Sequence, residues 1–425
     1  MTSRAVPAPP PDDPAPEVRL RDPAGVVAAV PYLLGFAPRR SLVVVGLDRQ
    51  RSVGPTMRVD WSPDRPVGTT RPVWQQLARV AVRNDCTAAL VVVYVDTPLL
   101  DLPAAWDDDL REAVLGPCDL PGPAGSLEPD GTAGPDVLDL LVVGPDRFRS
   151  LLCGDPSCCP GEGTAVAGTS SHPVAAGFVL AGRSPAPDRE ALVVEAVVTS
   201  RDRLRARDAA RAARTTSGRG SRPEVGSADL DLFERWAGSL PDGPDPELAG
   251  TLAAAWVTAP RLRDACLALL LPGGRDCALA VLAPHAQAGS ALGRVLADPA
   301  CSRATRVGTP VLRRLAALTE GPERATVLAA HAWLCWVAGE GTAAVVLAER
   351  SLDLDPAQSL ARLVLQCLGH GLGAAWTTAG PRPGPGGRGG SGARGRPGER
   401  RVDARRGYQD GPRPAPRDMS GGWWG

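Results

Sequence analysis

Runs of apolar residues in the first third of the chain predict strands, and amphipathic segments between them predict helices. Residues 41–48 and 88–96 are continuous, valine-rich runs, a pattern typical of strands buried on both faces. Residues 55–61 alternate apolar and polar side chains, with Met57 and Trp61 on one face, which predicts a half-buried strand. A further strand is expected at 136–144, and helices are expected at 23–31, 71–85 and 104–116.

This alternation of strands and helices indicates an α/β N-terminal domain. The strand at 55–61 follows the strand at 41–48 too closely for a crossover helix, so we expect a mixed sheet with flanking helices. Asp22 is a candidate N-cap, and the helix that it starts is expected to run up to Pro31, because proline disfavours a helix interior.

The second half of the chain has helical periodicity throughout. A charged helix capped by Asp188 is expected at 188–214, and the polar, Gly-containing stretch 215–227 reads as a linker. Residues 228–378 predict an all-α helical domain. Within it, 330–368 resembles part of a tetratricopeptide unit, but the period of about 34 residues does not recur upstream, so a generic helical hairpin is the competing interpretation.

Stretches rich in Pro, Gly and Arg indicate where the predicted domains begin and end. The predicted organisation is a disordered N-terminus at 1–17, an α/β domain at 18–214, the linker at 215–227, the helical domain at 228–378 and a disordered Gly/Arg/Pro-rich tail at 379–425. Residues 380–425 hold ten arginines against four acidic residues, which could support weak RNA binding. Because the formal net charge of the whole chain is zero, nucleic-acid binding is otherwise not expected.

No apolar run is long enough to span a bilayer, and the Pro-rich N-terminus lacks the apolar centre of a signal peptide. We therefore expect a cytoplasmic protein that does not enter a membrane and whose cysteines are mostly reduced. The scattered cysteines are expected to fill the core; they are Cys86, Cys266, Cys277, Cys301, Cys335 and Cys367.

The most distinctive stretch is CGDPSCC, which places Cys153, Cys158 and Cys159 beside a Pro/Gly turn. Zinc takes four ligands, often with cysteines two to four residues apart, so a zinc site with His172 as the nearest fourth ligand is one interpretation. A reactive or redox thiol is the second interpretation, although neighbouring acids such as Asp155 raise a thiol pKa. The third is a structural turn whose thiols pack inward.

The remaining histidines give little support to a cysteine nucleophile with a histidine base. His285, His331 and His370 lie in apolar helical stretches, where a histidine with satisfied hydrogen bonds in the core is expected. The chain also lacks a Gly-rich phosphate loop, a GxSxG elbow and an HExxH helix, so no standard nucleotide, hydrolase or metalloprotease chemistry is indicated.

Acidic residues at strand ends form a second candidate site. Ligands of open α/β sheets gather outside the carboxyl ends of strands, where Asp96 follows an apolar strand. Arg58 and Asp60 share one face of a strand and, with Asp96 and Asp155, are candidates for a polar pocket. The competing interpretation is that these acids start turns and that the Arg58–Asp60 pair is a solvated surface contact.

Three stretches, PYLLGFAPRRSLVVVGL, MRVDW and DRFRSLLCGDPSCCPGEGTAV, together resemble the actinobacterial domain of unknown function family 4192. The resemblance extends from about Arg19 to Trp376, and the cysteine block is its most specific part. RVDW departs from the Arg-x-Asp-Leu-Pro form of the family, which weakens any role for Arg58 and Asp60. The resemblance implies a cytosolic protein of a family without an assigned activity, and it supplies no catalytic residue.

Two hypotheses about function follow. The first is a non-enzymatic binding or regulatory protein that engages a protein partner through its helical domain, because catalytic motifs are missing and a helix pair resembles a tetratricopeptide unit. The second is a metal- or thiol-dependent enzyme or redox sensor centred on the CGDPSCC turn, with zinc as the cofactor in the metal-dependent form.

Overall fold

The computed structural model describes most of the chain between residues 18 and 374. The described ranges are 18–62, 69–103, 105–116, 134–157, 159–217, 227–243, 245–282 and 293–374. The disorder predicted for 1–17 and 379–425 lies outside these ranges, as do Cys158, His285 and most of the linker predicted at 215–227.

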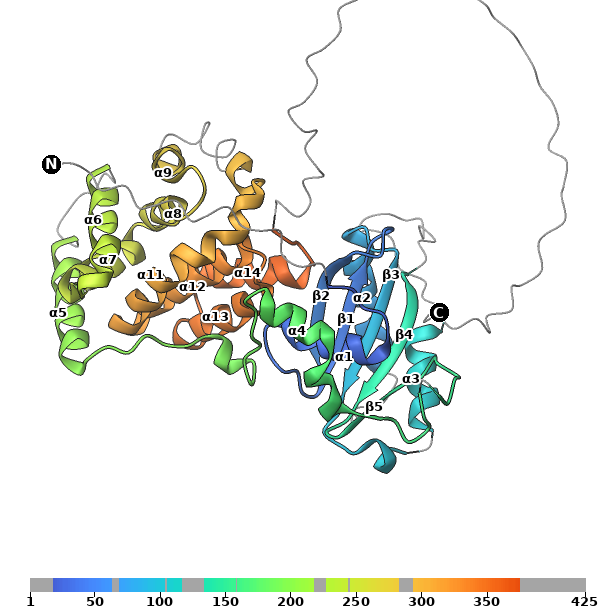
Figure 1. Ribbon diagram of the computed structural model, residues 1–425. Coiled ribbons are helices and arrows are strands. Elements are labelled where there is room, and N and C mark those ends of the chain that lie inside the picture. Colours follow the sequence, from blue (N-terminus) through green and yellow to red (C-terminus); the bar gives the residue numbers. More distant parts are fainter. Residues whose placement is uncertain are drawn as a thin grey trace, which may run out of the picture.

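A mixed sheet forms the centre of the N-terminal part (Figure 1). Its order is β2-β1-β3-β4-β5-β6; β3 and β4 run parallel, and the other neighbouring strands run antiparallel. This arrangement confirms the predicted mixed sheet. The strands are β1 (Ser41–Leu47), β2 (Val53–Asp60), β3 (Ala88–Tyr94), β4 (Asp136–Val143), β5 (Arg147–Ser150) and β6 (Thr164–Ala165).

Helices cover both faces of this sheet. Alternate residues of β1 point in opposite directions, so that Leu42 and Val44 pack with α2 (Thr70–Arg83) and α3 (Trp106–Leu115). Val43 and Val45 pack with α1 (Pro23–Leu34) on the opposite face. A further helix, α4 (Pro173–Leu180), lies against α1 (Figure 1). Burial on both faces explains why β1 and β3 are continuous apolar runs rather than alternating ones.

The first helix begins where the sequence predicts but ends later. Asp22 caps it, accepting a hydrogen bond of 2.6 Å from the Gly25 amide. The expected end at Pro31 is wrong: the helix contains Pro31, reaches Leu34 and stops at Gly35, whose φ is +83°. Packing of Leu34 into the core favours the extra turn over the loss of one backbone hydrogen bond at proline.

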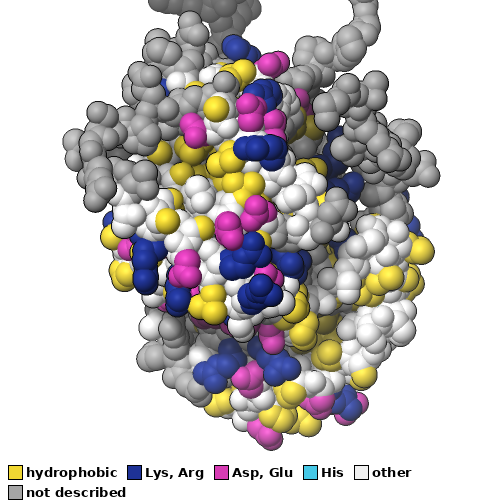
Figure 2. All heavy atoms as spheres, turned by 90° about the vertical axis from the view of Figure 1, so that its left-hand side faces the viewer, with side chains coloured by type: hydrophobic (Ala, Val, Ile, Leu, Met, Phe, Trp, Pro, Cys, Tyr) yellow, Lys and Arg dark blue, Asp and Glu magenta, His cyan; other side chains and the backbone are white. Residues whose placement is uncertain are grey.

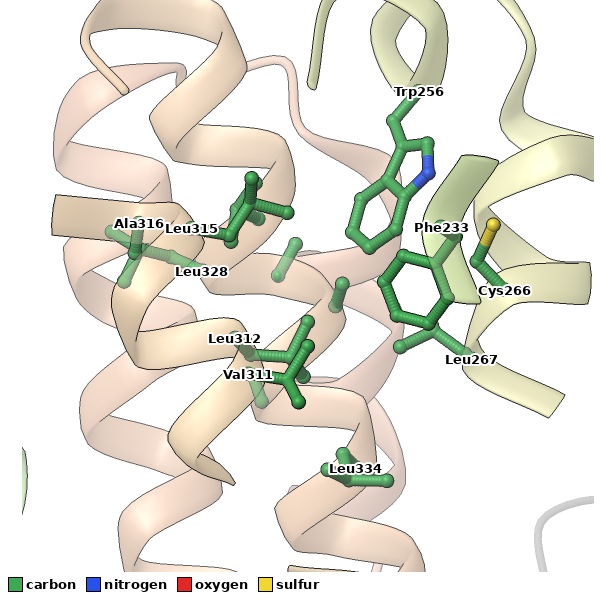
Figure 3. Close-up of a cluster of buried hydrophobic side chains, with 14 of the residues drawn as sticks. Phe233, Trp256, Cys266, Leu267, Val311, Leu312, Leu315, Ala316, Leu328 and Leu334 are labelled. Carbon is green, nitrogen blue, oxygen red and sulfur yellow. The ribbon is translucent and has the colours of Figure 1, made fainter. Parts of the chain in front are cut away.

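The C-terminal part is all helical, as predicted. Its core joins aromatic and aliphatic side chains from several helices, among them Phe233, Trp256, Leu312 and Leu334 (Figure 3). The helices are α5 (Ser200–Ser217), α6 (Ser227–Gly238), α7 (Pro246–Thr258), α8 (Pro260–Leu269), α9 (Gly274–Leu282), α11 (Ala304–Leu318), α12 (Gly321–Val337), α13 (Gly341–Leu354) and α14 (Ser359–Gly369). Short 3₁₀ helices occur in both parts of the chain. They are Leu99–Asp101 and Val166–Ser171 in the N-terminal part, Glu190–Leu192 in the connecting segment, and Leu240–Asp242 and Pro299–Arg303 in the helical part.

The helix expected at 188–214 is only partly correct. Asp188 accepts a hydrogen bond from the Ala191 amide at 2.7 Å, but the helix that follows is a short 3₁₀ helix whose N-cap position is Arg189. Regular helix begins at Ser200 with α5, whose Ala206 belongs to the core of the helical part. Helical packing therefore starts before 215–227, the stretch that the sequence indicated as a linker.

The two parts meet at the end of the helical region and along the segment that connects them. The side-chain amide of Asn84, just after α2, donates to the Gly371 carbonyl at 3.1 Å. Arg189 forms an ion pair of 2.6 Å with Glu349 of α13. Within the described ranges, no helix has the length and apolar character needed to cross a membrane.

Candidate functional site

The cysteine turn follows β5 and is fastened to the sheet by a buried carboxylate. Asp139 of β4 is 2% exposed, and its Oδ1 accepts hydrogen bonds from the Ser150 hydroxyl at 2.5 Å and from the Leu140 amide at 2.8 Å. The Ser150 oxygen accepts in turn from the amides of Leu152 and Cys153. Burial raises the pKa of Asp139, while the hydrogen bonds that Asp139 accepts from Ser150 and Leu140 oppose that shift. The sequence analysis missed this pair; the signal was an acid inside an otherwise apolar strand.

Within the turn, hydrogen bonds join neighbouring residues. Asp155 Oδ1 accepts from the amide and hydroxyl of Ser157, and the Asp155 carbonyl accepts from the Cys159 amide at 2.8 Å. Gly163 closes the stretch with a φ of +84°, a conformation that favours glycine. Asp155 thus acts as a turn residue, which supports the structural interpretation.

The proposed fourth zinc ligand lies in a different setting. His172 precedes α4, where its Nδ1 accepts from the Val174 amide at 3.3 Å and its Nε2 is 3.4 Å from Asp22. Among the residues that the structure describes, no three His, Cys, Asp or Glu side chains gather as metal ligands would. The described residues therefore do not support a zinc site. Because Cys158 lies outside the described residues, a zinc site on Cys153, Cys158 and Cys159 stays a prediction.

Five of the six scattered cysteines are buried, as expected, whereas Cys367 on α14 is only half-buried. Burial raises the pKa of Cys86 to about 11 and that of Cys266 to about 12. Cys335 is 2% exposed, and burial raises its pKa well above the usual value. Such thiols stay protonated near neutral pH and are poor nucleophiles.

The candidate polar residues on the strands separate into two places. The register places Asp60, Ser41 and Tyr94 in one row across β2, β1 and β3, and Asp96 follows at the same end of the sheet. Arg58 contacts Asp60 at 2.5 Å and donates to the Ser41 hydroxyl at 2.8 Å. Because β5 runs back toward the start of β4, the cysteine turn with Asp155 leaves toward the opposite end.

The carboxylates at these strand ends are solvated. The Asp60 side chain is 72% exposed, although that of its partner Arg58 is only 13% exposed, and Asp96 is 3.9 Å from Arg40 with both side chains about half exposed. Exposed ion pairs such as Arg40–Asp96 contribute at most about 1 kcal/mol to stability. The geometry therefore favours a surface contact over a pocket.

A cavity of about 410 Å³ lies in the helical part, among α11, α12 and α13. Each helix presents a stripe of residues with helical spacing to it. These are Arg313, Ala316 and Ala317 of α11; Arg324, Leu328 and His331 of α12; and Leu347, Arg350 and Leu354 of α13. In Figure 3, Ala316 and Leu328 lie on the side of the helical core away from Trp256. The cavity thus combines apolar walls with one arginine from each helix.

An extended segment runs along the outer side of this cavity, and we call residues 190–197 the strap. In Figure 1 the chain between α4 and α5 passes beside α13, and Val193, Val194 and Glu195 line the cavity. Arginines from three helices hold it: Arg350 donates to the carbonyls of Glu190 and Val193, Arg324 pairs with Glu195, and Arg314 donates to the Val197 carbonyl. Side chains from a distant part of the sequence therefore fix a segment whose only regular structure is one short 3₁₀ turn, Glu190–Leu192.

His331 lines the cavity and a smaller one of about 80 Å³ beside it. It is 3% exposed, and its Nε2 lies 3.2 Å from the Thr309 hydroxyl. Burial, with a smaller contribution from nearby Arg313, lowers the pKa of His331 to about 4, so the imidazole is neutral near pH 7.

The sequence prediction for the histidines was therefore only partly correct. His331 is buried, but its Nδ1 has no hydrogen-bond partner among the residues that the structure describes. His370, in contrast, is exposed at the end of α14. The residues of the cavity were missed because helical periodicity shows which face is buried but not where three faces enclose a space.

Comparison with known proteins gives one family. The family model described as Domain of unknown function (DUF4192) matches residues 23–374, which includes the sheet, the cysteine turn, the strap and the helical cavity. No curated protein and no solved structure matches the chain. Because the match covers well over half of the sequence, the chain belongs to the family of the domain of unknown function DUF4192.

Proposed function

We propose that this is a cytoplasmic, non-enzymatic binding protein whose helical part receives a small ligand in the cavity among α11, α12 and α13. One observation carries the proposal: the cavity of about 410 Å³ has largely apolar walls and is lined by a buried histidine, one nitrogen of which has no partner among the described residues. Ligand sites in proteins have this size and combine apolar walls with a few convergent polar groups.

The strap supports a regulatory form of binding. It joins the α/β part to the helical part and also forms part of the cavity wall, through Val193 and Glu195. A ligand that displaces or reinforces the strap would change how the two parts are connected, since a ligand shifts an equilibrium by its differential affinity for the two states.

A protein partner at the helical part, expected from the sequence, remains a second proposal. At the end of the helical part, Figure 2 shows side chains of both charges intermixed with apolar ones. Arg275, for example, contacts both Asp231 and Glu234 at 2.5 Å. Such a mixed surface favours a protein partner over a nucleic acid, whose phosphates call for a patch of positive charge.

The test is a ligand-observed NMR screen of a mixed-charge fragment library against the full chain. Ala317→Leu fills part of the cavity from α11, and Ala212→Leu on the exposed side of α5 is the matched control. We expect fragments that bind wild-type protein and Ala212→Leu but lose binding to Ala317→Leu. If no fragment binds, or if the bound fragments are insensitive to Ala317→Leu, the cavity is not a ligand site.

A further inference from the structure

Two polar atoms at the cavity lack partners within the part of the chain that the structure describes. Nε of Arg313 and Nδ1 of His331 are both buried and make no hydrogen bond. Leaving a buried polar group unsatisfied costs about 1–3 kcal/mol, so two such atoms on residues that line one cavity are suited to a polar group placed there. Both residues line the cavity, one from α11 and one from α12.

The chemistry of these two groups is that of hydrogen-bond donors. The guanidinium of Arg313 is cationic at any pH that the fold experiences. The neutral imidazole of His331 carries one proton, and when the Thr309 hydroxyl donates to Nε2 at 3.2 Å, that proton is on Nδ1. A cationic donor and a neutral donor then face the same ligand.

Other charges around the cavity are already used or lie at its outer edge. Arg324 pairs with Glu195, and Arg350 donates to two carbonyls of the strap. Glu320 and Asp353 are exposed, where solvent screens their charges. Among the arginines that line the cavity, Arg313 is therefore the cation that the described residues leave for a ligand.

We propose, building on the proposed function, that the cavity binds a small organic acid. Its carboxylate accepts hydrogen bonds from Arg313 and from Nδ1 of His331, and its apolar body packs against Leu328, Leu347 and Ala317. A carboxylate matches an arginine fork, and bonds between charged partners are about twice as strong as neutral ones. Apart from the strap's ion pairs and the exposed acids, apolar side chains form the wall, which suits an aliphatic or aromatic acid.

Matched acids and amides test this proposal on the full chain. The probes are octanoate and benzoate, each compared with its primary amide, which has nearly the same shape but no charge. We expect each acid to bind wild-type protein at least about tenfold more tightly than its amide, because one lost charge-assisted bond is worth about 1.4 kcal/mol or more. Titration calorimetry measures both affinities.

Two variants locate the preference. Arg313→Gln is expected to bind the acid and the amide equally, whereas Arg306→Gln, an exposed arginine on the same helix, is expected to keep the wild-type preference. Binding of neutral fragments in the cavity without a preference for acids would overturn this inference but leave the proposed function intact. Failure of both acids to bind wild-type protein overturns the inference without any variant having to fold.

Discussion

Acidification should destabilise this protein through His331. The pKa of this imidazole falls from 6.5 in the unfolded chain to about 4 in the folded protein, chiefly because the side chain is buried. Between these two values the unfolded chain binds a proton that the folded protein does not. Stability is therefore unaffected well above pH 6.5, is lost as the pH falls through 6.5, and stops falling near the folded pKa.

The size of the effect follows from the two pKa values. Each unit of pKa difference corresponds to about 1.4 kcal/mol, so the full effect is roughly 3 kcal/mol. At about pH 5, protonation of His331 in the unfolded chain has already lowered the free energy of unfolding by about 2 kcal/mol relative to neutral pH. His331 is 3% exposed, so solvent screening reduces this effect little.

Urea unfolding of the full chain measures this effect between about pH 7.5 and about pH 5. Because other groups also titrate, the informative quantity is the difference between wild type and His331→Gln. Between these two pH values, the free energy of unfolding of His331→Gln should fall by about 2 kcal/mol less than that of wild type. His370→Gln, at an exposed position, is the control and should follow wild type. Parallel pH curves for wild type and His331→Gln would refute the reasoning, because His331 would then titrate alike in both states.

Three further changes test contacts in other parts of the fold. Gly250→Ala places a methyl group against a backbone carbonyl of α5 and should lower the free energy of unfolding by about 2 kcal/mol or more. Gly238→Ala, whose methyl group meets open space, should be neutral or slightly stabilising. Urea unfolding midpoints of the two variants measure the difference, and equal midpoints would contradict the prediction. Ser150→Ala removes the link to the cysteine turn and should cost about 2–4 kcal/mol and speed labelling of Cys153 by a thiol reagent; unchanged labelling would contradict this. Arg350→Met should increase cleavage within the strap about tenfold in limited proteolysis, and an unchanged cleavage rate would show that the strap is held by other contacts.

Local sequence pattern predicted β1 and β3 well because these strands are buried on both faces, whereas the short strands β5 and β6 were not expected. The runs at β1 and β3 are apolar without interruption, so their boundaries were predicted to within two residues. The mixed sheet followed from the short connection between β1 and β2, which pair antiparallel.

The strap could not be predicted in this way. Its residues carry no helical or strand periodicity of their own, and the sequence reading extended a charged helix through them. What fixes the strap is a set of arginines more than a hundred positions later in the chain, such as Arg314 bonded to Val197. Contacts of this range depend on the tertiary fold, which no local window contains.

The candidate site has the same origin. Arg313 and His331 each look ordinary in their own helix, one as a surface charge and one as a core histidine. Their role depends on the packing of α11, α12 and α13, which places both on one cavity. The cysteine turn, in contrast, was conspicuous in sequence, yet its hydrogen bonds from Ser157 and Cys159 to Asp155 are those of a turn.

The most direct test of the account is a crystal structure of the full chain with octanoate or benzoate bound. We predict density for the acid in the cavity among α11, α12 and α13, with its carboxylate within hydrogen-bond distance of Arg313 Nε and His331 Nδ1. An acid bound elsewhere, or bound in the cavity with its carboxylate turned away from Arg313, would contradict the account.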